Sequence, residues 1–256
     1  MARDRSPRSR IQLRMKSVPR VMVASSALLL ALAEAPAFAC GVSGPDGAAC
    51  SISEHEEETR PKWRVGASGI ATGTSLRFSG GLRVDQTRYA ALGSIGYMPT
   101  PRLALSVGAG AAIGGEIVSP TGTHDFRAGP IGSLSASWRV VDEQPFVVLT
   151  SVLSFQAATT VPKAGGPAVG YEAIDLRLGA IAGVTLFDAL SPYALTRVFG
   201  GPVYWRYLGD SVTGTDVYHY QVGAGIAVKA AKRVSAFVEG VPLGERSIAL
   251  GATVAF

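Results

Sequence analysis

The sequence predicts an all-β fold, a closed antiparallel transmembrane β-barrel of about ten strands, with eight or twelve strands as alternatives. From Trp63 onward, apolar residues recur at every second position in runs of about 10 to 15 residues. Soluble strands average about 5–6 residues, whereas a tilted strand that crosses a bilayer needs about 9–11. The composition is 47% apolar and 17% charged, and no stretch after Trp63 is long enough for a transmembrane helix. Because lipid offers no hydrogen-bond partners, such strands have to close into a barrel.

Ten segments carry the alternating pattern. In Leu103–Ile113, for example, apolar residues occupy the odd positions and Gly, Ala or Ser the even ones. Gly200, Gly201 and Pro202 interrupt the seventh segment, and we expect a bulge there that moves Arg197 and Arg206 onto the same face. The predicted strands are about 63–78, 82–98, 103–118, 128–141, 146–160, 173–187, 193–209, 217–230, 234–243 and 247–256.

Short and long connections alternate between these segments. Short turns are expected at 98–102, 142–145, 188–192 and 231–233, and longer loops at 119–127, 161–172 and 209–216. Barrels in membranes commonly place short turns on one rim and long loops on the other. Aromatic residues cluster near both predicted rims, where amphipathic rings favour the headgroup zone.

The first 39 residues are predicted to be a signal peptide. A basic stretch precedes the apolar run Val21–Ala33, and Ala37-Phe38-Ala39 forms a small-x-small cleavage site. An uncleaved anchor and lipidation of Cys40 are the less favoured alternatives. The predicted domains are therefore the signal peptide 1–39, a periplasmic segment 40–62 with the cysteine pair and an acidic linker, and the barrel 63–256.

Cys40 and Cys50 are the only cysteines in the chain. An exported protein meets an oxidising compartment, so the pair is a disulfide candidate, which we favour over a metal site that includes His55 and the acidic run 56–58. No metal site is predicted.

The net charge of +5 does not indicate a nucleic-acid-binding protein, because all of the excess positive charge lies in the predicted signal peptide. Residues 1–39 hold seven basic and two acidic residues, which account for the whole excess. The remaining chain is neutral and carries no basic stripe interleaved with aromatics, so no nucleic-acid partner is expected.

The final strand points to a class of proteins. Ile248, Leu250, Val254 and Phe256 lie on one face, and the chain stops on an aromatic residue. This pattern resembles the closing strand of bacterial outer-membrane β-barrels of the small-barrel class. In that class the terminal aromatic is part of the signal read by the barrel-assembly machinery. The resemblance implies an outer-membrane location after cleavage near Ala39, with outer-membrane lipid and the assembly machinery as partners.

The predicted interior carries more basic than acidic residues. The guanidinium group of arginine presents paired N–H donors that bind anionic groups. One interpretation is therefore a mildly anion-preferring pore or a pocket for small polar or anionic solutes. The other is an Arg–carboxylate network that fills a narrow barrel, which we favour because eight strands leave an interior just filled by side chains. The predicted lumen charges are Arg64, Arg88, Glu116, Arg139, Asp175, Arg177, Arg197, Arg206, Lys229 and Glu239.

The leading functional hypothesis is a non-enzymatic outer-membrane barrel, either structural or a passive pore for small solutes. The alternative is a surface ligand-binding or adhesin-type barrel that acts through its long loops. A less favoured third hypothesis is a rim hydrolase that uses His124, Asp125, Asp216 and His219, since barrel proteases place Asp and His groups at such a rim. With three histidines in the chain and no phosphate-binding glycine loop, we predict no catalytic residues and no cofactor.

Overall fold

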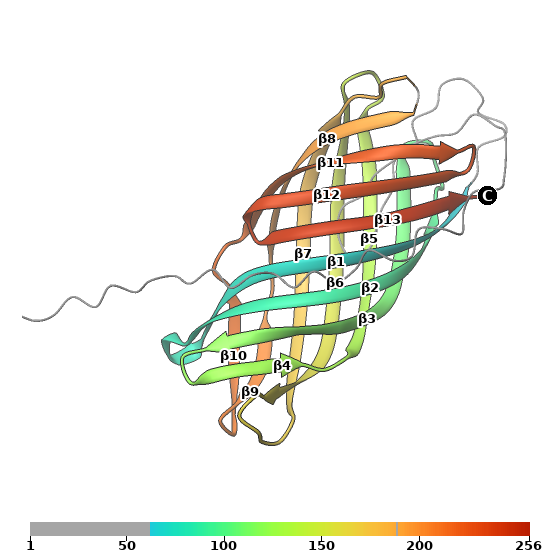
Figure 1. The fold of residues 1–256 in the computed structure, drawn as a ribbon. Coiled ribbons are helices and arrows are strands. Elements are labelled where there is room, and N and C mark those ends of the chain that lie inside the picture. Colours follow the sequence, from blue (N-terminus) through green and yellow to red (C-terminus); the bar gives the residue numbers. More distant parts are fainter. Residues whose placement is uncertain (1–61, 188) are drawn as a thin grey trace, which may run out of the picture. The chain divides into compact units, whose positions relative to one another are not determined.

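The computed structural model describes residues 62–187 and 189–256, and nearly all of this region is β-strand (Figure 1). Its one helical element is the 3₁₀ turn η1 (Ser79–Gly81), and no helix in the described region is long and apolar enough to cross a membrane. The predicted signal peptide, nearly all of the segment 40–62 and both cysteines lie outside the described residues.

Thirteen strands form a single antiparallel sheet. Most of them match a predicted segment to within a few residues at each end. The strands are β1 (Trp63–Phe78), β2 (Arg83–Tyr97), β3 (Leu103–Ser119), β4 (Gly122–Phe126), β5 (Gly129–Val141), β6 (Phe146–Pro162), β7 (Val169–Gly183), β8 (Leu190–Gly200), β9 (Val203–Tyr207), β10 (Asp210–Asp216), β11 (Tyr220–Ala231), β12 (Val234–Gly244) and β13 (Arg246–Ala255).

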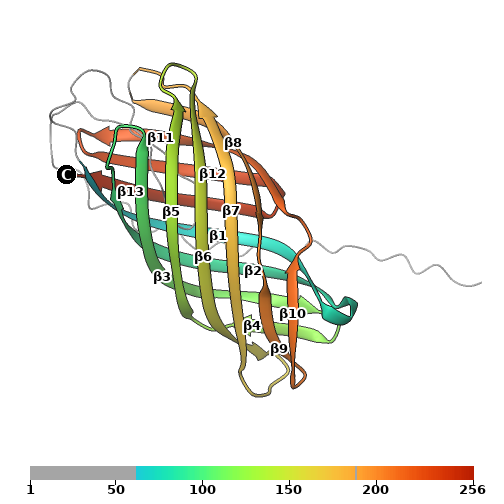
Figure 2. The same ribbon diagram turned by 180° about the vertical axis from the view of Figure 1, so that it is seen from behind.

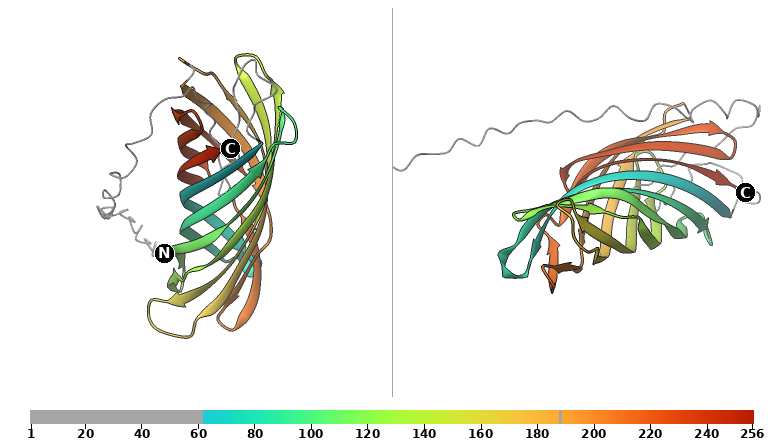
Figure 3. Two further views of the ribbon diagram at one scale, coloured as in Figure 1. Left: turned by 90° about the vertical axis from the view of Figure 1, so that its right-hand side faces the viewer. Right: turned by 60° about the horizontal axis from the view of Figure 1, so that its bottom comes forward.

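Ten of these strands close into a ring, so the predicted fold class is confirmed. The ring runs β1-β2-β3-β5-β6-β7-β8-β11-β12-β13, and β13 pairs with β1 over ten residue pairs to close it. The N–H of Trp63 donates to the carbonyl of Phe256, which joins the first and last strands at one end of the barrel, here called the terminal rim. The strands cross the barrel obliquely, as the side views show (Figure 3).

The barrel is narrower at the end opposite the terminal rim. There β4 replaces β5 between β3 and β6, and the β9–β10 hairpin bridges β7 to β1. The β12–β13 hairpin stops before this end, so β10 pairs directly with β1. The ring here is β1-β2-β3-β4-β6-β7-β9-β10, and we call this eight-stranded section the collar (Figures 1 and 2).

The long outer loops expected from the sequence are largely strand. Segment 119–127 contains β4, segment 209–216 contains β10, and segment 161–172 holds the ends of β6 and β7. Their polar and glycine-rich composition is typical of loops, yet cross-strand pairing within the collar satisfies their backbone groups. Only short turns remain at the tips, such as Leu208–Gly209 between β9 and β10.

Side chains on the two faces of the wall differ in polarity. Large apolar side chains such as Ile95, Val107, Leu134 and Leu250 are more than half exposed on the outer face. Arginine, glutamine, serine and glutamate side chains are buried on the inner face. A soluble barrel has the opposite arrangement, because its core is apolar and its exterior polar. This polarity is the one that a barrel surrounded by lipid requires.

Candidate functional site in the barrel interior

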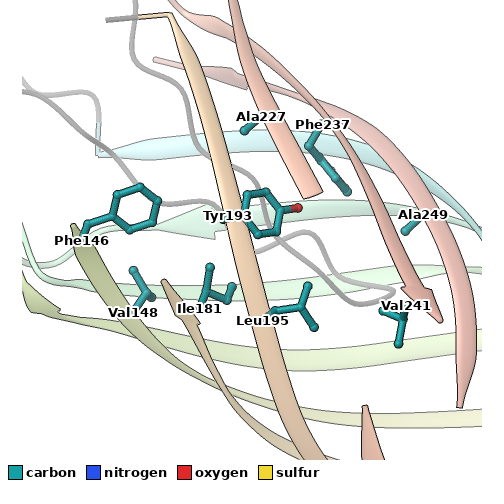
Figure 4. Packing of buried hydrophobic residues seen from close by; sticks show 9 residues of the cluster. All are labelled: Phe146, Val148, Ile181, Tyr193, Leu195, Ala227, Phe237, Val241 and Ala249. Atoms are coloured by element: carbon teal, nitrogen blue, oxygen red, sulfur yellow. The ribbon is translucent and has the colours of Figure 1, made fainter. Parts of the chain in front are cut away.

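The interior is filled in three zones: an apolar cluster near the terminal rim, a polar zone at mid-height, and an aromatic cluster inside the collar. The first zone contains Phe146, Tyr193, Leu195 and Phe237, which extend from the three strands β6, β8 and β12 into the barrel (Figure 4). Each of these side chains is at least 94% buried. These buried apolar side chains pack against one another in the part of the interior near the terminal rim.

The polar zone is organised around Arg177 on β7. Its Nη1 and Nη2 donate to the two carboxylate oxygens of Glu245 at 3.2 Å each, and its Nε donates to Asp175. The guanidinium also lies over the ring of Phe199, 4.9 Å from the centroid. A buried arginine held by two carboxylates is fully compensated in charge, and the bidentate geometry fixes its direction.

A second ion pair lies on the neighbouring strands. Arg197 on β8 donates from Nη2 to Glu239 on β12 at 3.0 Å and from Nη1 to Gln221 at 3.2 Å. The hydroxyl of Tyr193 donates to the same glutamate at 3.3 Å. These side chains connect β8, β11 and β12 across the inner face and occupy space that small inner residues leave open.

A third group spans the barrel from β2 to β6 and β7. Arg88 donates from Nη1 to the Oε1 atom of Gln156, and the Tyr171 hydroxyl donates to Gln86 at 2.8 Å. The strands that hold these residues lie on different sides of the ring. The hydrogen bonds therefore cross the lumen and do not merely follow the wall.

The collar is closed by aromatic side chains. Trp205 is 1% exposed, packs 4.6 Å from the ring of Tyr207 and 5.1 Å from that of His124, and donates from Nε1 to Thr160 at 2.9 Å. The same cluster contains Leu76, Phe78, Val84, Ile117, Phe126, Tyr171 and Val203. An eight-stranded ring is just wide enough for such side chains to fill it.

Eight of the ten predicted lumen charges lie on the inner face. Arg88, Asp175, Arg177, Arg197 and Glu239 make up most of the polar zone described above. The other three are Arg64, Arg139 and Lys229, which occupy inner positions nearer the terminal rim.

Glu116 and Arg206 face outward, contrary to the prediction. A bulge in the β2–β3 pairing, where Tyr89 faces Gly114 and Ala90 faces Ala112, reverses the side-chain alternation of β3 before Glu116. That residue instead forms an exposed ion pair with Lys163 at 2.8 Å. At Pro202 the expected bulge is absent, because β9 continues on β7 in the register of β8, so Arg206 stays outside and Trp205 inside.

The four residues of the hydrolase hypothesis do not form a site. His124 is buried in the collar cluster, while Asp125 follows it on the opposite face and pairs with Lys163 at 3.3 Å. Asp216 lies inside and accepts a hydrogen bond from Thr74, and the Nδ1 atom of His219 contacts the carbonyl of Phe199. No group of three or more His, Cys, Asp or Glu side chains within the described ranges is placed to hold a metal ion.

Glu245 is an interior residue that the sequence did not reveal. It lies between two predicted strands, where a solvated turn residue is expected, yet it is 3% exposed. The lengths of the neighbouring strands could have predicted that Glu245 is buried. β12 and β13 have 11 and 10 residues, against 16 in β1, so their turn lies part-way along the barrel.

The last strand presents its apolar residues to the exterior. Ile248, Leu250, Val254 and Phe256 are all exposed on the outer face. The closed ring, its polar interior and its apolar exterior together define the fold class. The chain has the fold of a bacterial outer-membrane β-barrel.

No family model and no curated protein sequence matches the chain. Among solved structures, the translocator domain of the autotransporter NalP from Neisseria meningitidis is similar, with 13% identity, a TM-score of 0.47, and coverage of 80% of this chain and 92% of that one. The β domain of the Bordetella autotransporter BrkA is 13% identical, with a TM-score of 0.44 over 75% of this chain and 99% of that one. The toluene transporter TodX of Pseudomonas putida is 8% identical, with a TM-score of 0.28 over 75% and 88%.

Proposed function

We propose that this chain is a non-enzymatic, structural barrel of the outer membrane whose lumen does not pass solutes. The observation that carries the proposal is the filled interior. The cluster of Phe146, Tyr193, Leu195 and Phe237 and the collar cluster around Trp205 lie on either side of the ion-paired polar zone, and we infer that together they close the lumen. Outer-membrane lipid covers the apolar exterior, and the collar projects beyond the belt of exposed aromatics.

The rims support this placement in a membrane. Trp63, Tyr97 and Phe256 are exposed near the terminal rim, and Tyr89, Tyr204 and Tyr220 are exposed towards the collar. Aromatic residues on the outer face of a barrel commonly mark the two membrane interfaces. The collar tips lie beyond the second group, where they are free to contact the surroundings.

Solute release from lipid vesicles tests the proposal. The full chain, refolded into vesicles loaded with arabinose, should release the sugar no faster than protein-free vesicles, while a heat-dependent gel shift shows that the barrel has folded. A porin reconstituted at the same molar ratio is the positive control. Arabinose release that rises with the amount of folded barrel would replace the structural role with a passive pore.

A second candidate function, surface binding through the collar tips, rests on Leu208. This side chain is 79% exposed at the end of the β9–β10 hairpin and has a positive φ of 51°. A two-residue turn with positive φ at both positions favours Asn-Gly, and an exposed leucine there is unfavourable for the fold alone. A partner that binds the exposed Leu208 side chain would account for a leucine at this position.

Cell-surface attachment tests this second candidate. Intact cells that display the chain should bind an apolar surface, such as hydrophobic beads, more than cells that display the Leu208→Asn chain. The control is Val212→Asn, which alters an inner residue of the same hairpin. Equal attachment by the wild-type and Leu208→Asn chains, at equal surface levels, would exclude the tip as a binding element.

A further inference from the structure

The polar zone encloses a cavity of about 60 Å³ between the two apolar clusters. Side chains of β1, β2, β6 and β7 and of the β12–β13 turn line it, among them Thr74, Arg88, Gln156, Asp175 and Glu245. One water needs about 10–15 Å³ on this measure, so the cavity holds about four or five non-hydrogen atoms.

Three buried polar atoms on this lining have no hydrogen-bond partner. They are the Nε of Arg88, the Nε2 of Gln156 and the Oδ1 of Asp175. Gln156 is only 5% exposed, so its free amide N–H cannot be satisfied by bulk water. A buried polar group without a partner is unfavourable, and three of them around one cavity point to a polar ligand that would bind there.

The arrangement of these atoms sets the chemistry of the occupant. Arg88 and Gln156 are adjacent, because Arg88 already donates to the Oε1 atom of Gln156. Together they offer two N–H donors. Asp175 offers the acceptor, and it lies diagonally across the β6–β7 pairing from Gln156, since Ser154 faces Asp175 and Gln156 faces Ala173.

The charges and the free donors around the cavity disfavour simple ions. A lone anion beside Arg88 would meet the carboxylates of Asp175, Asp216 and Glu245, and a lone cation beside Asp175 would leave the N–H donors of Arg88 and Gln156 without an acceptor. Burying an uncompensated charge among like charges is unfavourable. A molecule that is neutral overall, with an acceptor at one end and a donor at the other, satisfies all three free atoms.

The geometry points to this cavity as a binding site for a small zwitterionic or amide-type solute of about the size of glycine. Its carboxylate or carbonyl accepts from Arg88 and Gln156, and its ammonium or amide N–H donates to Asp175. This assignment goes beyond the structural role proposed above, and a barrel that binds such a solute still does not conduct.

Equilibrium dialysis of the full chain, refolded in detergent micelles with radiolabelled probes present, tests the assignment. Glycine should bind saturably, with about one molecule per folded barrel, while acetate and methylammonium should each bind at least tenfold more weakly. Binding in micelles is independent of transport, so it stays distinguishable from the vesicle result. Equal binding of all three probes, or no saturable glycine binding, would overturn the assignment.

Two substitutions and one control substitution sharpen the test. Gln156→Leu removes a free donor and should lower glycine affinity at least tenfold, whereas Ser133→Ala removes a buried hydroxyl that does not line the cavity and should leave it unchanged. Asp175→Asn should weaken glycine and strengthen acetate, because it removes the carboxylate that repels an anion. Each chain is first checked for folding by its heat-dependent gel shift. Unchanged probe selectivity in the folded Asp175→Asn barrel would contradict the assignment.

Discussion

The collar and the ten-stranded part of the barrel are filled by different means. In the collar, Trp205, Tyr207 and Phe126 meet across a narrow ring. In the wider part, glycine, alanine and serine dominate much of the inner face. There Arg177 reaches Glu245 in the β12–β13 turn, and Arg197 reaches Glu239 along the inner face. The difference shows that two added strands make the interior too wide for aromatic packing alone, so long paired arginines complete the filling.

The change from ten strands to eight depends on one short hairpin. Because β12 and β13 end at the Gly244–Glu245 turn, β10 reaches β1 directly through Leu76 and Asp216 and two further pairs. The same turn delivers Glu245 to Arg177. The number of strands in the wall therefore falls at the level where Arg177 pairs with Glu245. The substitutions below compare the contribution of this ion pair to stability with the contribution of the aromatic packing in the collar.

The largest effect is expected from Arg177→Met. The substitution leaves the carboxylates of Asp175 and Glu245 buried without their shared cation, which costs about 3–5 kcal/mol. Urea unfolding in lipid vesicles, followed by tryptophan fluorescence, measures the loss. Arg206→Met on the outer face is the matched control and should change stability by less than about 0.5 kcal/mol. Equal losses of unfolding free energy in the two variants would show that the ion pair of Arg177 does not stabilise the barrel.

A loss of about 3–5 kcal/mol is also expected from Trp205→Ala, at the lower end of that range if the collar relaxes. The substitution removes the largest buried side chain of the collar and its hydrogen bond to Thr160. Its neighbour Tyr204 faces outward, so Tyr204→Ala should cost less than about 1 kcal/mol. Unfolding midpoints in urea compare the two. A larger loss from Tyr204→Ala would reverse the assigned faces of β9.

A small gain is expected from Leu208→Asn at the collar tip. It creates the Asn-Gly pair that a turn with positive φ at both positions favours, and we expect a stabilisation of up to about 1 kcal/mol. The same unfolding assay measures it. Destabilisation by more than about 1 kcal/mol would show that Leu208 packs within the fold and is not available to a partner.

The smallest effect is expected at Lys163, on the outer face of the collar. Hydrogen bonds to Glu116 and Asp125 raise the pKa of Lys163 above its usual value of 10.5. A raised pKa in the folded state means that the contact stabilises the fold below about pH 10.5 and is lost as the pH rises through the folded-state pKa. Glu116→Gln should therefore reduce the difference in stability between pH 9 and pH 12. An unchanged difference would mean that the contact adds nothing to stability.

The alternation of apolar residues predicted the fold because each strand has one face towards lipid, and eight of the ten lumen charges follow from it. The orientations of Glu116 and Arg206 were predicted wrongly. A bulge changes which face of a strand the following side chains occupy, and whether a bulge forms depends on how two strands pair. A pair of glycines stands at both places, but the bulge was predicted at Gly200-Gly201-Pro202, where none exists, and not at Gly114-Gly115, where one does. Glu245 was missed because its burial depends on the relative lengths of neighbouring hairpins. The collar strands have the composition of loops and fold only within the closed ring.

Single-channel recording from the full chain in planar lipid bilayers tests the central claim, a lumen closed by two apolar clusters in series with an ion-paired zone. The account predicts no stepwise conductance from the folded wild-type barrel in 1 M KCl, and none from Trp205→Ala, because the terminal cluster and the Arg177 and Arg197 pairs still fill the path. Uniform, stable conductance steps from the wild-type barrel would contradict a filled interior.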